Sequence, residues 1–304
     1  MSDLKFYFKF LLVLLGIILI GTFILPEKLG FFSFVPQKIL AHKQNELTLL
    51  LIGKPGEGYI GGENTDSLII VHLILNDQPK IYLIPIPRDL IVFDKNNNLT
   101  KINQLYALKE LDTLLQKASD YSGLEIKNYF VYDLHFILGL AEVLGGIEVK
   151  LDQPVIDAVS FYTIYPGKRI LKGDDLELVL RSRYYPDGDF QRIKNQLAVI
   201  EGFKNKFLNL SWSDKIKILK FVLTNRKNWQ TNLNQETIYF LLNKSQEFKE
   251  AQIKVILLTT KEQFLKSGYF TLGNSEGVYG IYPSLGIDDY NHIKNYILAE
   301  LKNN

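Results

Sequence analysis

Cysteine is absent from the 304-residue sequence, which excludes disulfide frameworks, thiolate nucleophiles and cysteine-ligated zinc or iron–sulfur sites. The sequence also lacks an excess of charge, since 35 Lys and Arg residues face 33 Asp and Glu residues. Without a broad positive field the protein has no means of coating DNA or RNA, so we expect no nucleic-acid partner. The apolar share of 47% is typical of a globular protein and excludes a disordered or fibrous chain.

Histidine is scarce, and the motifs of common hydrolases are missing. The four histidines belong to no metal or catalytic pattern, and neither G-x-S-x-G nor H-E-x-x-H occurs, so acyl hydrolysis and zinc proteolysis lack support. We interpret His72, inside the apolar run LIIVHLIL, as a core residue rather than a base. The segment from Gly56 to Gly61 matches G-x-G-x-x-G, but an apolar strand follows it where a dinucleotide needs a helix N-terminus. We therefore predict a turn or a loop that lines a site.

One long apolar run lies near the N-terminus. Residues Phe10 to Leu25 are uncharged, and counted from Phe6 the run reaches the roughly 20 residues that cross a bilayer. The positive-inside rule places residues 1–5 in the cytoplasm and the chain after Pro26 outside. A cleaved signal peptide is a weaker interpretation because no small-x-small cleavage site follows, and a buried core helix is weaker still because the run is apolar all round. We predict an anchor at residues 1–26 and a juxtamembrane linker at 27–45.

Short apolar runs and segments of helical spacing interleave in the rest of the chain. They predict strands at 47–52, 68–75, 80–86, 129–132, 147–151 and 254–258, with a turn at 76–79. They predict helices at 105–119, 136–144, 174–207 with an interruption at 185–188, 209–250, and 287–301, the last capped by Asp288 or Asp289. This order predicts an α/β (α+β) fold, one domain with a central mixed sheet flanked by helices.

Arginines occur at three places where chemistry is plausible. Arg88 and Asp89 end an apolar strand, and Arg181 and Arg183 end an amphipathic helix. In the next helix, one stripe that continues into apolar positions carries a polar trio: Asp189, Arg192 and Gln196.

Several arginines directed at one region repel each other unless an anion lies between them. Guanidinium groups bind phosphate oxygens in pairs and stay charged, so a pyrophosphate is the natural ligand. The alternative is that Arg88–Asp89 and Arg192–Asp189 are structural ion pairs and that Arg181 and Arg183 form a solvated helix end. Asp66 precedes the second strand and has no neighbouring Lys or Arg. It is equally compatible with a Mg²⁺ ligand and with a turn cap.

These pieces, taken in order, resemble the LytR–CpsA–Psr family of cell-envelope glycopolymer transferases. The resemblance covers about residues 47–207 and includes Thr65-Asp66-Ser67, Ile86-Pro87-Arg88-Asp89, Lys101-Ile102-Asn103, Leu144-Gly145-Gly146, Arg181-Ser-Arg183 and Asp189-x-x-Arg192-x-x-x-Gln196. It implies that residues 46–208 form the catalytic domain and leaves 209–304 as an extension of unknown function.

The resemblance also implies a hydrophobic tunnel for a polyprenyl chain and transfer of a phospho-glycan from its pyrophosphate to a peptidoglycan hydroxyl. Carried over by position, the pyrophosphate ligands are Arg88, Arg181, Arg183, Arg192 and Gln196. Asp66 then binds Mg²⁺, while Asp89 and Asp189 orient arginines. Phosphoryl transfer depends on such positioning and charge stabilisation, with Mg²⁺ as Lewis acid.

Two departures concern the metal site. The family commonly has an acidic residue where this chain reads Gly53-Lys54-Pro55, and an arginine where it has Glu63. Glu57 or Glu63 is a candidate for the second carboxylate. The sequence therefore predicts a membrane-anchored, extracytoplasmic transferase. The alternatives are a non-catalytic module that binds polyprenyl-phosphate lipids or glycans, and a lipid pyrophosphatase.

Overall fold

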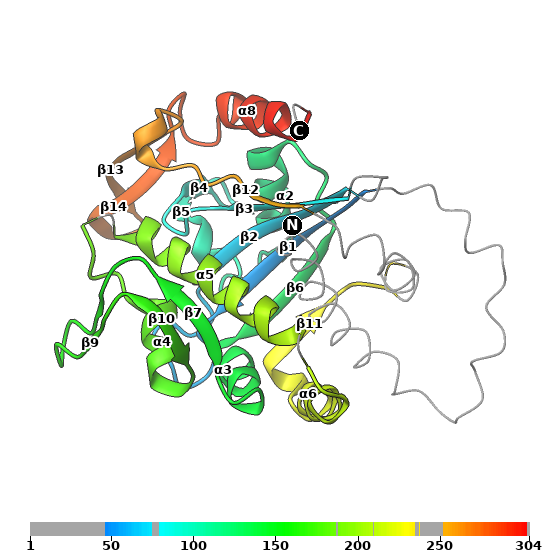
Figure 1. Ribbon diagram of the computed structural model, residues 1–304. Coiled ribbons are helices and arrows are strands. Elements are labelled where there is room, and N and C mark those ends of the chain that lie inside the picture. Colours follow the sequence, from blue (N-terminus) through cyan, green and yellow to red (C-terminus); the bar gives the residue numbers. More distant parts are fainter. Residues whose placement is uncertain are drawn as a thin grey trace, which may run out of the picture.

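The computed structural model describes residues 46–302 except 75–78, 187, 209, 235–236 and 238–251. A six-stranded sheet crosses its centre with the strand order β11-β6-β1-β2-β3-β12 (Figure 1). Its strands are β1 (Glu46–Lys54), β2 (Ser67–Ile74), β3 (Lys80–Pro85), β6 (Asn128–Asp133), β11 (Trp229–Thr231) and β12 (Gln252–Val255). The β1–β6 and β3–β12 pairs are parallel and the other pairs antiparallel. This mixed sheet confirms the predicted α+β class.

The central strands are continuous apolar runs because both faces of the sheet are covered. Along β1, Leu49 and Leu51 contribute to the core on one face, while Leu50 and Ile52 contribute to the core on the other. Successive side chains of a strand point to opposite faces, so a strand that is buried twice needs apolar residues at every position. The same alternation continues through β2 and β3.

Helices from different parts of the chain cover the two faces. One face packs against α3 (Leu134–Val143), α4 (Gly173–Arg181), α5 (Asp189–Leu208) and α6 (Trp212–Thr224). The other packs against α2 (Leu111–Ser122) and α8 (Asn291–Lys302). Gly202 lets α5 approach the small sheet beside it, because a Cβ there would lie 2.6 Å from the carbonyl oxygen of Glu148.

Four two-stranded sheets complete the described part of the fold. They are β4 (Ile91–Phe93) with β5 (Leu99–Lys101), β7 (Ile147–Leu151) with β10 (Gly167–Leu171), β8 (Val155–Ile156) with β9 (Thr163–Ile164), and β13 (Leu265–Leu272) with β14 (Ser275–Pro283). Short 3-10 turns η2 (Ile102–Gln104), η3 (Arg226–Asn228) and η5 (Thr260–Glu262) connect elements. In Figure 1 the β13–β14 hairpin lies at the upper left, toward α8, and β9 projects at the lower left.

Most predicted elements are present, and the differences have physical causes. The helix predicted at 105–119 begins only at Leu111, because Lys109 has a left-handed φ of 62° and Glu110 is the N-cap. Within the helix predicted at 209–250, α6 ends at Thr224 and is followed by β11, which was not predicted. Residues 209, 235–236 and 238–250 of that prediction lie outside the described residues. The β13–β14 hairpin was also not predicted. The strand predicted at 254–258 lies at 252–255, and the last helix begins at Asn291, where Asp289 Oδ1 accepts from the Asn291 amide.

The predicted anchor at 1–26, the linker at 27–45 and the turn at 76–79, Pro79 apart, lie outside the described residues. Among the residues that are described, no helix is long and apolar enough to cross a membrane. His72 is buried in β2 as expected, and its Nδ1 lies 2.9 Å from the Thr48 hydroxyl.

Candidate anion site

The site begins at one edge of the central sheet, where β1 ends and β2 starts. The segment predicted as a turn runs from β1 back to β2, and its bonds include one from the Gly56 amide to the Gly62 carbonyl. The Asp66 amide donates to the Gly53 carbonyl at 2.7 Å, and the Thr65 amide donates to the Asn103 carbonyl at 2.9 Å. These backbone bonds fix the Asp66 carboxylate at the sheet edge.

Arg88 reaches the same edge because β3 lies antiparallel to β2. The Ile86 amide donates to the Leu68 carbonyl at 2.9 Å, which brings the end of β3 beside the start of β2. The Arg88 guanidinium forms an ion pair with Asp66 Oδ1, and its Nε has no hydrogen-bond partner among the described residues. Asp89, expected to pair with Arg88, instead accepts from Lys101 Nζ at 2.8 Å. The predicted Arg88–Asp89 pair was therefore wrong, and the cation that Asp89 orients is Lys101.

The end of α4 contributes Arg181. Its Nε lies 3.9 Å from Asp66 Oδ2, its Nη1 donates to Glu177 at 2.9 Å, and its Nη2 donates to the Ile60 carbonyl at 2.6 Å. The Tyr59 ring lies against the same guanidinium, 5.7 Å from its centroid. The glycine-rich turn is thus a loop that lines the site, one of the two roles expected for it.

The start of α5 contributes a buried ion pair. Arg192 is 1% exposed and forms a salt bridge with Asp189, three residues earlier on the same helix. Its Nη1 lies 4.0 Å from Asp66 Oδ1, and its Nε has no hydrogen-bond partner among the described residues. Burial raises the pKa of Asp189 and lowers the pKa of Arg192, and the attraction between the two charges opposes both shifts.

Gln196 lies one turn further along α5 and acts on the backbone. Its Nε2 donates to the Asp66 carbonyl at 3.3 Å and to the Leu180 carbonyl at 3.2 Å. The structure therefore uses the amide nitrogen of this predicted phosphate ligand to hold Asp66 and the end of α4 in place. Arg183 is exposed, but its charge acts on Asp189 and Arg192.

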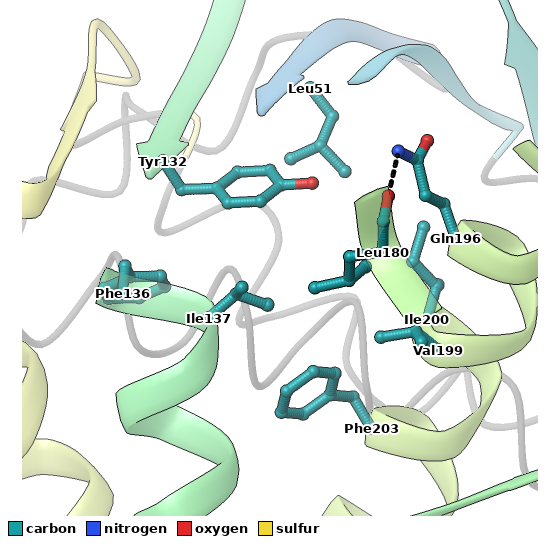
Figure 2. A pocket seen from close by; sticks show the side chains of 9 residues that line it. All are labelled: Leu51, Tyr132, Phe136, Ile137, Leu180, Gln196, Val199, Ile200 and Phe203. Atoms are coloured by element: carbon teal, nitrogen blue, oxygen red, sulfur yellow. Dashed lines mark hydrogen bonds between the residues drawn. The ribbon is translucent and has the colours of Figure 1, made fainter. Parts of the chain in front are cut away.

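Gln196 also lines an apolar cavity (Figure 2). Its volume is about 30 Å³, the space of a water molecule or two. The lining side chains come from β1, β6, α3, α4 and α5 and are Leu51, Tyr132, Phe136, Ile137, Leu180, Gln196, Val199, Ile200 and Phe203. The Tyr132 hydroxyl points toward this space in Figure 2, and burial raises its pKa to about 12.

Three guanidinium groups thus converge on one carboxylate. Asp66 does not satisfy all of their donors, because Nε of Arg88 and Nε of Arg192 have no hydrogen-bond partner among the described residues. Buried arginine donors without acceptors are costly, and a phosphate or pyrophosphate supplies more oxygens in a geometry that matches the guanidinium fork. The fold and this cluster define a candidate anion-binding site at the edge of a mixed sheet.

The site offers a divalent cation few carboxylate ligands. No group of three or more His, Asp or Glu side chains that could hold a metal occurs within the described residues. Asp66 Oδ2 lies beyond hydrogen-bonding distance of Arg181, so it has room for one bond to a metal. Glu63, a possible second ligand, is engaged by Lys54 Nζ at 2.7 Å, and Glu57 is exposed. One carboxylate fits Mg²⁺ where water and phosphate oxygens complete its shell.

Sequence patterns did not predict two residues of the site. Lys101 lies next to Asp89 only because β5 folds back along β4, and Ile60 acts through its carbonyl. The Lys101-Ile102-Asn103 motif could have pointed to Lys101. Ile60 could not have been predicted from its side chain, because only its backbone carbonyl takes part.

The chain belongs to the LytR_cpsA_psr family, whose pattern matches residues 28–278. TagU of Enterococcus faecalis, named a polyisoprenyl-teichoic acid–peptidoglycan teichoic acid transferase, is 29% identical over 182 residues, which are 59% of each chain. LcpA of Corynebacterium glutamicum, a cell wall biosynthesis protein, is 26% identical over 48% of this chain and 33% of its own length. Biofilm regulatory protein A of Streptococcus mutans is 30% identical over 61% of this chain and 49% of its own. The chain thus spans between a third and about half of the length of the last two relatives.

Solved structures share the fold. TagV of B. subtilis superposes with a TM-score of 0.62 at 21% identity, covering 86% of this chain and 98% of its own. TagT bound to LIIa-WTA gives a TM-score of 0.62 at 18% identity, covering 85% and 92%.

Proposed function

We propose that the protein is a membrane-anchored, extracytoplasmic phosphotransferase that moves a phospho-glycan from a polyprenyl-pyrophosphate carrier to a peptidoglycan hydroxyl. The observation that carries this proposal is the convergence of Arg88, Arg181 and Arg192 on Asp66, beside an apolar cavity. A lipid pyrophosphate has both an anion for such a cluster and a hydrocarbon chain for such a cavity. The names of TagU and LcpA, which refer to a teichoic acid transferase and to cell wall biosynthesis, support the same class of reaction.

In this reaction the acceptor hydroxyl oxygen attacks the phosphorus that carries the glycan. A new P–O bond forms, the pyrophosphate bridge breaks, polyprenyl phosphate leaves, and the hydroxyl proton passes to water. Arg88 and Arg181 stabilise charge on the phosphoryl oxygens and on the leaving group, which is the main requirement of phosphoryl transfer. Arg192 supports them from the interior, held by Asp189. Mg²⁺ on Asp66 would supply Lewis-acid stabilisation.

Lipid entry requires the apolar cavity to enlarge. A volume of about 30 Å³ is far below that of ligand pockets, which are about 300–1,000 Å³. The side chains that line the cavity from α3 and α5 include Ile137 and Phe203. We therefore expect the lipid chain to separate these two helices as it binds.

Transfer itself is the test. The full-length chain in detergent is supplied with a short-chain polyprenyl-pyrophosphate saccharide and peptidoglycan, and attachment of saccharide is followed with and without Mg²⁺. We expect transfer that depends on Mg²⁺ in the wild type and is lost in Asp66→Ala. Arg169→Ala is the control, because this exposed guanidinium donates to the carbonyls of Tyr165 and Pro166, just before its own strand β10. Lipid binding without transfer would favour a binding module, and saccharide release without attachment would favour a pyrophosphatase.

A further inference from the structure

A polar groove lies next to the arginine cluster, with Arg88 in its lining. It has a volume of about 590 Å³, within the range of small-molecule sites. One wall is the β5–η2 segment, and the other is the tip of the β13–β14 hairpin with Leu272, Gly273 and Ser275. The mechanism above leaves this groove unused.

Asp66 contacts one lining residue of the groove and one of the cavity. Arg88 lines the groove and forms an ion pair with the Asp66 side chain. Gln196 lines the cavity and donates to the Asp66 carbonyl. The anion site therefore borders on both an apolar space and a polar groove. A transfer reaction needs such an arrangement, because donor and acceptor must reach the same phosphorus from different directions.

The chemistry of the groove indicates what it binds. Its lining combines the amides Asn64 and Asn103 and the cation Lys101 with apolar side chains such as Leu108 and Leu272. Asn103 is 3% exposed, and its Oδ1 has no hydrogen-bond partner among the described residues. A buried carbonyl oxygen of this kind calls for a donor from a ligand. Amide groups mixed with small apolar surfaces suit a sugar ring, which has hydroxyl donors at its edge and C–H groups on its faces.

We propose that this groove binds the saccharide of the acceptor, with the accepting hydroxyl at the Arg88 end. The proposal rests on the proposed transferase function, whose acceptor it places. Asn103 Oδ1 then accepts a hydrogen bond from a sugar hydroxyl or amide N–H, and the hairpin tip contacts the sugar ring. The backbone of Asn103 also positions the site, because its carbonyl accepts from the Thr65 amide.

The test uses a substitution that fills the groove without touching the core. Ser275 is exposed at the hairpin tip, so Ser275→Trp places a large ring in the groove at no cost in packing. Glu276→Trp is the matched control, because Glu276 is exposed beside Ser275 but does not line the groove. Asn103→Leu removes the unpaired oxygen, and its folding is checked by thermal unfolding.

Binding and kinetics are measured separately on the full-length chain in detergent. A tetrasaccharide of N-acetylglucosamine is titrated by calorimetry, and KM is measured for acceptor and for donor. In Ser275→Trp and Asn103→Leu we expect saccharide affinity to fall and acceptor KM to rise by about tenfold or more. Donor KM stays unchanged in Ser275→Trp, and Glu276→Trp resembles the wild type throughout.

Unchanged saccharide affinity and acceptor KM in both variants would overturn the proposal. The proposal would also be overturned if the wild type bound a stem peptide but not the tetrasaccharide, and Ser275→Trp blocked that binding. The groove would then be a peptide site. If the wild type transfers nothing, the proposed function fails, and the loss of tetrasaccharide binding in Ser275→Trp still decides whether the groove holds sugar.

Discussion

Two arginine–carboxylate pairs lie at the same edge of the sheet, and they differ in their access to solvent. Arg192 and Asp189 have side chains that are 1% and 9% exposed, whereas Arg88 and Asp66 are 13% and 18% exposed. The first pair is set by the spacing of one helix, and the second joins two strands through the register of the sheet. The same type of ion pair therefore occurs in two environments. The Arg192–Asp189 pair is closed off from solvent, whereas Arg88 of the second pair lines the groove and is open to it.

Breaking the buried pair should give the largest effect on folding. Arg192→Ala leaves the Asp189 carboxylate buried without its cation, and we expect a loss of about 3–5 kcal/mol in the free energy of unfolding. Urea denaturation of the full-length chain measures it, with Arg169→Ala as the control at the surface. A loss no larger than that of the control would show that the pair has no structural role.

The pH dependence of stability should reveal the burial of His72, a titratable group without a charged partner among the described residues. Burial lowers the pKa of His72 from 6.5 to about 4, so the unfolded chain takes up a proton at a higher pH than the folded chain does. Stability from the neutral ring is therefore complete above pH 6.5 and is lost as the pH falls through 4, by up to about 3 kcal/mol. Denaturant midpoints between pH 7 and 4 should fall less steeply in His72→Val. The exposed His292→Gln variant should follow the wild type, and an equal slope in all three proteins would contradict the prediction.

Arg88→Ala should lower activity much more than stability, the reverse of what we expect for the buried pair. We expect transfer to fall about 100-fold or more, because a group that stabilises the transferring phosphoryl is lost. The loss of stability should be only about 1 kcal/mol, because water reaches this side of the pair. The rate of saccharide attachment and urea denaturation are measured on the same preparation. A variant that loses stability like Arg192→Ala but keeps its activity would reverse the roles of the two pairs.

Asp89→Asn should have the smallest effect. It weakens the hold on Lys101 Nζ, 2.8 Å away, in the wall of the groove. We expect transfer to slow about fivefold, corresponding to about 1 kcal/mol. Steady-state rates at saturating donor measure this, and a loss as large as that of Arg88→Ala would mean that Asp89 contacts the reacting groups.

The sequence allowed the central strands and the α4–α5 stripe to be predicted, because continuous apolar runs and helical spacing are local signals. Arg88 was paired with Asp89, its sequence neighbour, whereas its partner is Asp66, brought to it by the β2–β3 register. A register is a property of the folded sheet, and single residues do not encode it. The β13–β14 hairpin was missed although Gly273-Asn274 is a turn signal. Tyr269 and Tyr279 are exposed, so aromatic residues lie on both faces of the hairpin and its strands lack a clear alternation of apolar and polar residues.

The most direct test of the central claim is the affinity of the arginine cluster for a lipid pyrophosphate. Farnesyl pyrophosphate is titrated into the full-length chain in detergent, into Arg88→Ala and into Arg169→Ala, at two salt concentrations. The account predicts saturable binding that weakens with salt, falls at least about tenfold in Arg88→Ala and is retained in Arg169→Ala. Equal affinity in all three proteins would contradict it.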